Sequence, residues 1–363
     1  MGCKPHTFVD YADMNIRYLK ATGMVQSKGK GIALIPEKHF LAVRLTQNLL
    51  SDRPLLELYR TLCRGSELPT DNAAVALQVL KDLRIQLKDY GIAYSIEGRP
   101  LDTAAHINQI RYQMESLISE KKEEIYAQEQ SSCWKEIAAY MKLLSSRKER
   151  LKIGGDTEIS IPRTEAPAYL EWSLWRAFLA LGGLVNKPYE VRRFSVDQDF
   201  YPVSTAPGSG PDLVAEFSTC VVVIEATLSE NSRQEAMEGE PVRRHVAALM
   251  QQYQKPVYGL FIANQIDSNT AETFRIGIWY TRDDKKLDLQ IVPATLSQFN
   301  ALFQALFETH QETPDAVIQV MSVCEKCRAE NEAPTWKKRI SEIFEQAVGT
   351  LRHPGKENRQ MPR

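Results

Sequence analysis

The sequence predicts an α/β domain, with a central mixed sheet flanked by helices, in residues 151–350, and a largely helical region before it. After residue 151, short apolar runs alternate with amphipathic segments, which is the pattern of a layered α/β fold. No glycine occurs between Arg111 and Ile153, as expected for a region that is helical throughout. A Lys-Gly-Lys-Gly turn near residue 29 separates two short apolar segments, which indicates a hairpin.

The amino-terminal half divides into two predicted parts. Residues 1–52 have the order of a winged-helix-like segment: a short helix over 11–22, two strands around the Lys-Gly-Lys-Gly turn, and a second helix from Glu37. A plain βα unit with a solvated basic turn is the alternative. Residues 53–150 carry helical periodicity and are predicted to form an α-helical linker domain.

The second half begins where glycines and prolines interrupt the helical pattern, around residues 153–167. Apolar runs predict strands over 212–217, 220–227, 256–264, 274–281 and 289–294. Between them we expect helices over 166–183, 232–253, with a bend at Pro241, and 296–310. The tail, residues 351–363, is rich in charge and proline and is predicted to be disordered.

Composition narrows the classes of protein further. With 363 residues, 43% hydrophobic and 25% charged, the chain resembles an ordinary globular protein of about two domains. No apolar run approaches the length of a membrane span. The six cysteines are scattered, which favours reduced thiols and a cytoplasmic setting. The net charge is −1, but the first 50 residues carry seven Lys or Arg against three acids, so a basic face is still expected there.

Two carboxylates near the most apolar run suggest a metal site. Asp212 begins one predicted strand, and Glu225 comes late in the next, 13 residues on. Two antiparallel strands joined by a tight turn bring these positions together. Carboxylate oxygens are ligands that Mg²⁺ prefers, and a substrate phosphate can complete its shell. A bound ion would also offset the cost of burying Glu225.

The neighbouring helices offer further candidates. Gln234 and Glu238 are four residues apart and Glu238 and His245 seven apart, so we expect them on one helix face, with Arg244 beside them. Glu171 is the acid of the preceding helix. Read singly, Glu225 could be an ordinary strand-edge acid, and His245 a surface histidine. Their convergence favours a metal-dependent phosphodiesterase site.

A longer pattern covers the same residues. The segment IEATLSENSRQEAMEGEPVRRHV resembles the signature of the AlwI-type restriction endonucleases, a group within the PD-(D/E)xK nucleases that includes large subunits of nicking endonucleases. NIRYLKATGMV, from Asn15 to Val25, is similar to the last DNA-binding segment of that family. The matching residues of the signature are Glu225, Thr227, Leu228, Gln234, Glu238, Pro241, Val242, Arg244 and His245, with Asp212 upstream and Glu171 on the preceding helix.

The resemblance implies a type IIS-like enzyme that hydrolyses double-stranded DNA outside a short recognition site. It implies that Asp212 and Glu225 hold Mg²⁺ with the backbone carbonyl of Ala226, and that Glu238 and His245 orient the attacking water. A second nuclease subunit or a second copy of the chain is the expected partner for cutting both strands. The basic residues of the winged-helix-like segment would contact DNA phosphates; they are Arg17, Lys20, Lys28 and Lys30.

Two features depart from this pattern. Thr227 stands where the wider nuclease core has a lysine, so Arg244 or a second metal ion would have to supply positive charge. Only 14 residues precede Asn15, whereas family members carry a substantial target-recognition region there. We therefore expect a chain that lacks much of that region. The alternatives are a catalytically idle DNA-binding or partner protein that keeps the nuclease scaffold, and a repair nuclease that acts on flaps or junctions.

Overall fold

The structure is a computed structural model. The residues that it describes are 12, 15–16, 19–20, 23–28, 31–46, 54–63, 69–154, 157–229, 234–329 and 332–353. Packing divides the chain into two compact units, which are Met1–Ile125 with Asp197–Tyr201, and Tyr126–Val196 with Pro202–Arg363. Most of the predicted first helix and of the predicted tail lies outside the described residues.

The first unit contains the predicted hairpin and the first long helices. Its elements are β1 (Val25–Lys28), β2 (Gly31–Leu34), α2 (His39–Thr46), α3 (Leu55–Cys63), α4 (Ala73–Asp89) and α5 (Ala104–Glu129), which ends in the second unit. β1 and β2 pair antiparallel, as the Lys-Gly-Lys-Gly turn predicts. Asn72 caps α4 by accepting from the backbone N–H of Ala74 at 2.9 Å. Leucine, isoleucine and valine side chains of α4 and α5 form the core of this unit.

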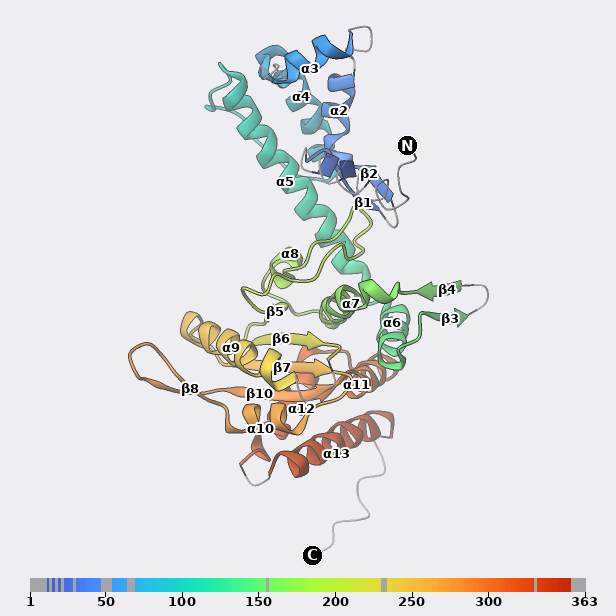
Figure 1. Cartoon of the computed structure of the whole chain (residues 1–363), viewed down its shortest axis with the longest axis vertical. Coiled ribbons are helices and arrows are strands. Elements are labelled where there is room, and N and C mark those ends of the chain that lie inside the picture. Colours follow the sequence, from blue (N-terminus) through green and yellow to red (C-terminus); the bar gives the residue numbers. More distant parts are fainter. Residues whose placement is uncertain are drawn as a thin grey trace, which may run out of the picture. The chain divides into compact units, whose positions relative to one another are not determined.

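The second unit alternates strands and helices (Figure 1). Its elements are α6 (Trp134–Ser146), β3 (Arg150–Gly154), β4 (Thr157–Ser160), α7 (Ala166–Leu181), α8 (Pro188–Val191), β5 (Leu213–Glu216), β6 (Val221–Thr227), α9 (Glu240–Gln252), β7 (Val257–Ala263), α10 (Ser268–Ile276), β8 (Ile278–Tyr280), β9 (Lys286–Asp288), β10 (Gln290–Thr295), α11 (Leu296–Glu308), α12 (Pro314–Lys326) and α13 (Ala333–Arg352). α13 reaches Arg352, so the first two residues of the predicted tail are helical.

The central sheet has four strands in the order β10-β7-β6-β5. β6 pairs parallel with β7, and β7 pairs parallel with β10, whereas the edge strand β5 pairs antiparallel with β6. The four residues from Val221 to Ile224 are completely buried, as expected of a strand covered on both faces. This confirms the predicted mixed sheet flanked by helices.

Close packing fixes α9 against this sheet. Gly259 of β7 lies under α9, and a Cβ there would come within 3.0 Å of Cγ2 of Val246 and 2.9 Å of Cγ1 of Ile291. Because neighbours in a parallel pair face the same side, Val223, paired with Gly259, also faces α9. Glu225 lies two residues on, so α9 covers the face of β6 that carries Glu225.

The structure corrects two of the predicted elements. The strand expected over 274–281 is only Ile278–Tyr280, because α10 occupies 268–276. Asp267 caps this helix through the N–H of Asn269 at 2.9 Å, and Gly277 ends it with a positive φ of 56°. In the helix before β7, the irregularity lies before Pro241, in a π-helical turn from Glu235 to Gly239.

One predicted linker helix belongs with the sheet. The sequence places α6 in the helical linker, but it packs on α7 and α11 of the second unit, and Asn300 of α11 donates to the carbonyl of Ala138 at 3.1 Å. Its buried apolar face explains this placement. Among the described residues, no helix combines the length and the apolar character needed to cross a bilayer.

Candidate active site

The two carboxylates predicted to meet are directly opposed across the β5–β6 pair. Leu213 pairs with Ile224, so the same antiparallel register continued by one residue places Asp212 opposite Glu225. The backbone N–H of Ala226 donates to Oδ2 of Asp212 at 2.8 Å, which ties the start of β5 to the end of β6. Glu225 is only 7% exposed, so this pair of carboxylates lies at a buried edge of the sheet.

Helix α7 brings a third carboxylate to this edge. Glu171 is buried, and its Oε2 accepts from the backbone N–H of Ala206 at 2.7 Å. The negative charges of Asp212 and Glu225 act on it and help to raise its pKa. α7 is almost wholly apolar otherwise, so a buried acid on it needs a reason beyond packing. The structure thus brings Glu171 together with the two strand carboxylates.

Glu238 approaches from the π-helical turn before α9. It is half-buried, and the side chain of Thr227 donates a hydrogen bond to it. Gln234 is completely buried, whereas Glu238 is half-buried beside Thr227, so these two side chains have different surroundings. π turns inside helices frequently mark functional sites.

Gln234 hydrogen-bonds to the backbone of two loops. Its Nε2 donates to the carbonyls of Ser229 at 2.7 Å and Gln265 at 2.9 Å, and its Oε1 accepts from the N–H of Asp267 at 2.9 Å. The buried amide therefore joins the chain leaving β6 to the chain leaving β7. Its role is to hold these two loops next to the site.

His245 of α9 binds Glu225 directly. Its Nδ1 lies 2.6 Å from Oε1 of Glu225, and both side chains are buried. Burial and, to a smaller extent, the nearby positive charge of Arg244 lower the pKa of His245 to about 4. At neutral pH the ring is therefore uncharged. Its other nitrogen, Nε2, is buried and has no hydrogen-bond partner among the described residues.

The carboxylates are difficult to ionise together. Burial is the main cause that raises the pKa values of Glu171, Asp212 and Glu225 to about 8, and the pKa of Glu238 is raised by burial as well. Like charges add to this: Glu225 acts on Asp212, and Glu238 acts on both. His245 is neutral and cannot balance them. The cluster therefore favours whatever positive charge can enter it.

Two arginines stand at the margin of the cluster. Arg244 is exposed and pairs with Glu240, with Nε 3.2 Å from Oε1, yet its charge lowers the pKa of Glu225. Arg193 does the same, although sequence reasoning did not select it. Its guanidinium lies over Gly210, where a Cβ would come within 1.9 Å of Nη1. The glycine two residues before Asp212 was the signal that could have indicated a close approach.

The donor set suits a hard cation. Among the described residues, no three His, Cys, Asp or Glu side chains are spaced to enclose an ion by themselves. Mg²⁺ does not require such a cage, because it keeps several waters and commonly uses one or two protein carboxylates. Opposed, buried and mutually repelling carboxylates are the chemistry that such an ion would satisfy.

Most of the side chains predicted to contact DNA lie outside the described residues. Arg17 and Lys30 are not among the described residues, and neither is the side chain of Lys28, whose backbone ends β1. Lys20 is described and half-buried. Their roles stay predictions.

The fold and the site together define an α/β protein with a cluster of buried acids at one sheet edge. The chain belongs to the AlwI restriction endonuclease family, whose family model matches residues 2–302. This confirms the resemblance drawn from the sequence, and it supports a nuclease role and DNA binding. Among solved structures, the small subunit of the heterodimeric restriction endonuclease R.BspD6I is similar over 60% of this chain and 98% of that chain, at 20% identity and a TM-score of 0.41. No curated protein matches the chain.

Proposed function

We propose that the chain is a Mg²⁺-dependent, type IIS-like DNA endonuclease of PD-(D/E)xK type that cuts outside a short recognition site. The observation that carries the proposal is the placement of Asp212 opposite Glu225, with Glu171 beside them. Buried carboxylates in this state are costly to a fold. A role in holding a metal ion, which the nuclease family supports, would explain why they are kept.

In this proposal Asp212, Glu225 and the carbonyl of Ala226 hold the ion. When bound, Mg²⁺ supplies charge stabilisation to the scissile phosphate and a more acidic water. Glu225 in its ionised form accepts from Nδ1–H of His245, which fixes the ring tautomer and leaves Nε2 as a buried acceptor. Thr227 holds Glu238 by a hydrogen bond, so that this carboxylate can orient a water.

Positive charge near the site comes from arginine in this proposal. Thr227 replaces the lysine of the wider core, and it cannot carry charge. Arg193 and Arg244 both lower the pKa of Glu225, and Arg193 is the one whose guanidinium is seated over the glycine before Asp212. We assign Arg193 to the positioning of charge beside the scissile phosphate.

The amino-terminal unit is the proposed DNA-binding part. Its hairpin and the following helix α2 have the order of a winged helix, and Arg17, Lys20, Lys28 and Lys30 are the proposed phosphate contacts. A second nuclease subunit or a second copy of this chain would cut the other strand. No disulfide joins the cysteines of the described residues, which fits the proposed reducing, cytoplasmic setting.

The test is cleavage of supercoiled plasmid DNA by the full chain, with Mg²⁺ and with EDTA. We expect nicked or linear product only with Mg²⁺, and a loss of at least about a thousandfold for Glu225→Gln, since the metal contributes several kcal/mol to the transition state. Glu345→Gln, an exposed acid of α13 outside the cluster, is the matched control and should cut normally. A wild-type protein that binds DNA but never cuts it at any Mg²⁺ concentration would favour the idle DNA-binding alternative.

A further inference from the structure

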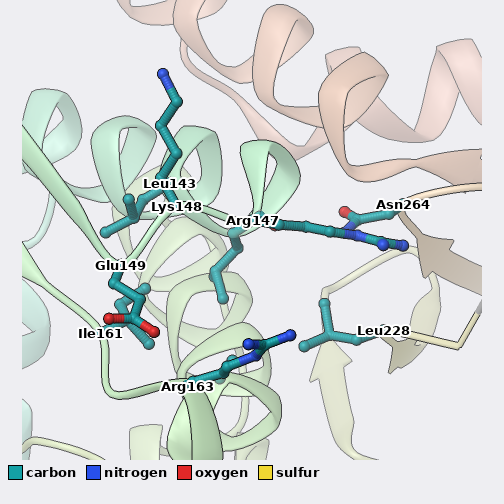
Figure 2. Close-up of a pocket in the computed structure, with 10 residues that line it drawn as sticks. Leu143, Arg147, Lys148, Glu149, Ile161, Arg163, Leu228 and Asn264 are labelled. Carbon is teal, nitrogen blue, oxygen red and sulfur yellow. The ribbon is translucent and has the colours of Figure 1, made fainter.

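A second site lies near the carboxylate cluster, in the same unit. A cavity of about 350 Å³ opens where the chain leaves β6 and β7 (Figure 2). The end of α6, the hairpin β3–β4 and the start of α7 complete it. Its lining residues are Leu143, Leu144, Arg147, Lys148, Glu149, Ile161, Arg163, Ala166, Leu228 and Asn264.

The cavity lining is basic, and two of its cationic side chains point toward the strand ends. It contains three cationic side chains and one carboxylate. Figure 2 shows the guanidinium of Arg147 extending toward Asn264 and that of Arg163 toward Leu228, whereas Lys148 points away from both. In the described part of the chain, no ion pair joins Arg163 or Lys148 to a carboxylate. Two guanidinium groups therefore face the side of the cavity that lies at the strand ends.

The backbone at Arg147 is unusual for its residue type. Arg147 ends α6 with φ 54° and ψ 25°, in the left-handed region. Glycine is the usual residue at such a helix end, and another residue costs about 1–2 kcal/mol there. An arginine kept in a conformation that favours glycine suggests that its side chain is needed.

Asn264 adds an unsatisfied polar atom to the same wall. Its Nδ2 donates to the carbonyl of Leu144 at 3.3 Å, but its Oδ1 is buried with no hydrogen-bond partner among the described residues. A buried acceptor of this kind needs a donor. A water that bridges to a bound oxyanion would supply one, which is a common arrangement in protein–nucleic acid contacts.

The distance to the catalytic residues suits one strand of a duplex. Leu228, in the cavity wall, follows Glu225 by three residues along β6, roughly 10 Å of extended chain. One strand of DNA advances about 3.4 Å per nucleotide along the helix axis. We propose that the cavity binds a backbone phosphate of the DNA duplex through Arg147 and Arg163, a few nucleotides from the scissile phosphate. This inference rests on the proposed function and assigns a DNA contact to the nuclease unit itself.

The test measures the salt dependence of DNA binding. The full chain, in EDTA to prevent cleavage, is titrated against a fluorescein-labelled duplex of mixed sequence by anisotropy at several salt concentrations. Each lost phosphate contact should reduce the slope of log K against log salt by about 0.9 and weaken binding by about eightfold at 0.1 M salt. We expect this for Arg147→Gly and for Arg163→Ala. Lys142→Ala removes the same charge from the exposed face of α6, outside the cavity lining, and should leave the slope unchanged.

The choice of Arg147→Gly separates binding from folding. Glycine removes the cost of the left-handed backbone, which offsets the loss of the contacts that the Arg147 side chain makes, so this variant should stay folded and melt close to the wild type while it binds DNA more weakly. Unchanged slopes for both arginine variants, in a wild type that binds and cuts DNA, would overturn the cavity proposal alone. A wild type that does not bind DNA would overturn the proposed function. A third outcome is that inorganic phosphate at constant ionic strength raises the melting temperature of wild type but not of Arg147→Gly, and that wild type and variants show the same slope of log K against log salt. In that case the cavity binds a free anion and the DNA assignment is wrong.

Discussion

Two buried glutamates, one in each unit, show what separates a structural charge from a candidate catalytic one. Glu115 of α5 is 6% exposed and Glu225 of β6 is 7% exposed. Lys38 hydrogen-bonds to Glu115, and Nη1 of Arg111 lies 3.6 Å from its Oε1. Glu225 instead meets a neutral histidine and other carboxylates, and its pKa is raised to about 8. The two glutamates are equally buried but have opposite surroundings. The charge of Glu115 is balanced by neighbouring cations, whereas the charge of Glu225 is left to be balanced from outside.

The largest expected change in unfolding free energy is a loss for a variant of the first unit, and the matching variant of the second unit should gain stability. Lys38→Met leaves Glu115 buried with a weaker partner, and we expect a loss of about 3–5 kcal/mol of unfolding free energy. Glu225→Gln in EDTA at pH 9 should raise the stability, because it removes a buried charge that repels its neighbours. Chemical denaturation measures both. The double variant Lys38→Met/Glu115→Gln should recover most of the loss; a Glu225→Gln variant as destabilised as Lys38→Met would break the contrast.

Added Mg²⁺ tests whether the charge of the carboxylate cluster is balanced by a bound ion. An ion that enters the cluster should stabilise the wild type by about 2.7 kcal/mol at 100 times its Kd. Because the pKa values of Asp212 and Glu225 are raised to about 8, protons compete with the ion, and the gain should grow from pH 6.5 to pH 8.5. Thermal melts at constant ionic strength measure it. Asp212→Asn should show no gain, and an equal gain in that variant would place the ion elsewhere.

Glu325 of α12 is intermediate between Glu115 and Glu225, because it has a cationic partner and yet a raised pKa. Nη1 of Arg328 lies 3.3 Å from its Oε2, yet burial still raises its pKa to about 7. The folded state therefore holds the proton more tightly than the unfolded state, and stability falls as pH rises from about 4.5 to 7. Glu325→Gln should be about 2 kcal/mol more stable than wild type at pH 8 and equal to it at pH 4. A difference that does not change with pH would show that packing, rather than charge, decides the effect.

The smallest effect concerns the arginine beside the cluster. Gly210→Ala places a Cβ within 1.9 Å of Nη1 of Arg193, so the guanidinium must move while the fold stays intact. We expect about tenfold slower plasmid cleavage, or ~1.4 kcal/mol of transition-state stabilisation, with an unchanged melting temperature. Gly208→Ala has open space around its Cβ and is the control. Equal rates for both variants would remove Arg193 from the proposed mechanism.

Local pattern accounts for what was predicted of the fold. The apolar run before Glu225 made β6 a buried strand, and the Lys-Gly-Lys-Gly turn made the first hairpin. α10 is not evident from the sequence because its start depends on the cap at Asp267. Phe274 and Ile276 also alternate with Arg275 and Gly277 in the two-residue period of the strand that follows, so the pattern predicts a longer strand. α6 was assigned to the linker because helical periodicity indicates that a face is buried, but not which partner covers it.

The sequence by itself determined which residue types are available for chemistry and that Asp212 and Glu225 would meet, since a tight turn and a two-residue period fix the register of a hairpin. Only the tertiary structure decided their surroundings: the neutral His245 against Glu225, Arg193 over Gly210, and the two arginines that face the cavity at the strand ends. The physical reason is that burial and charge balance depend on segments far apart in the chain. Periodicity describes one segment at a time, whereas the pKa of a buried acid is set by every element packed around it.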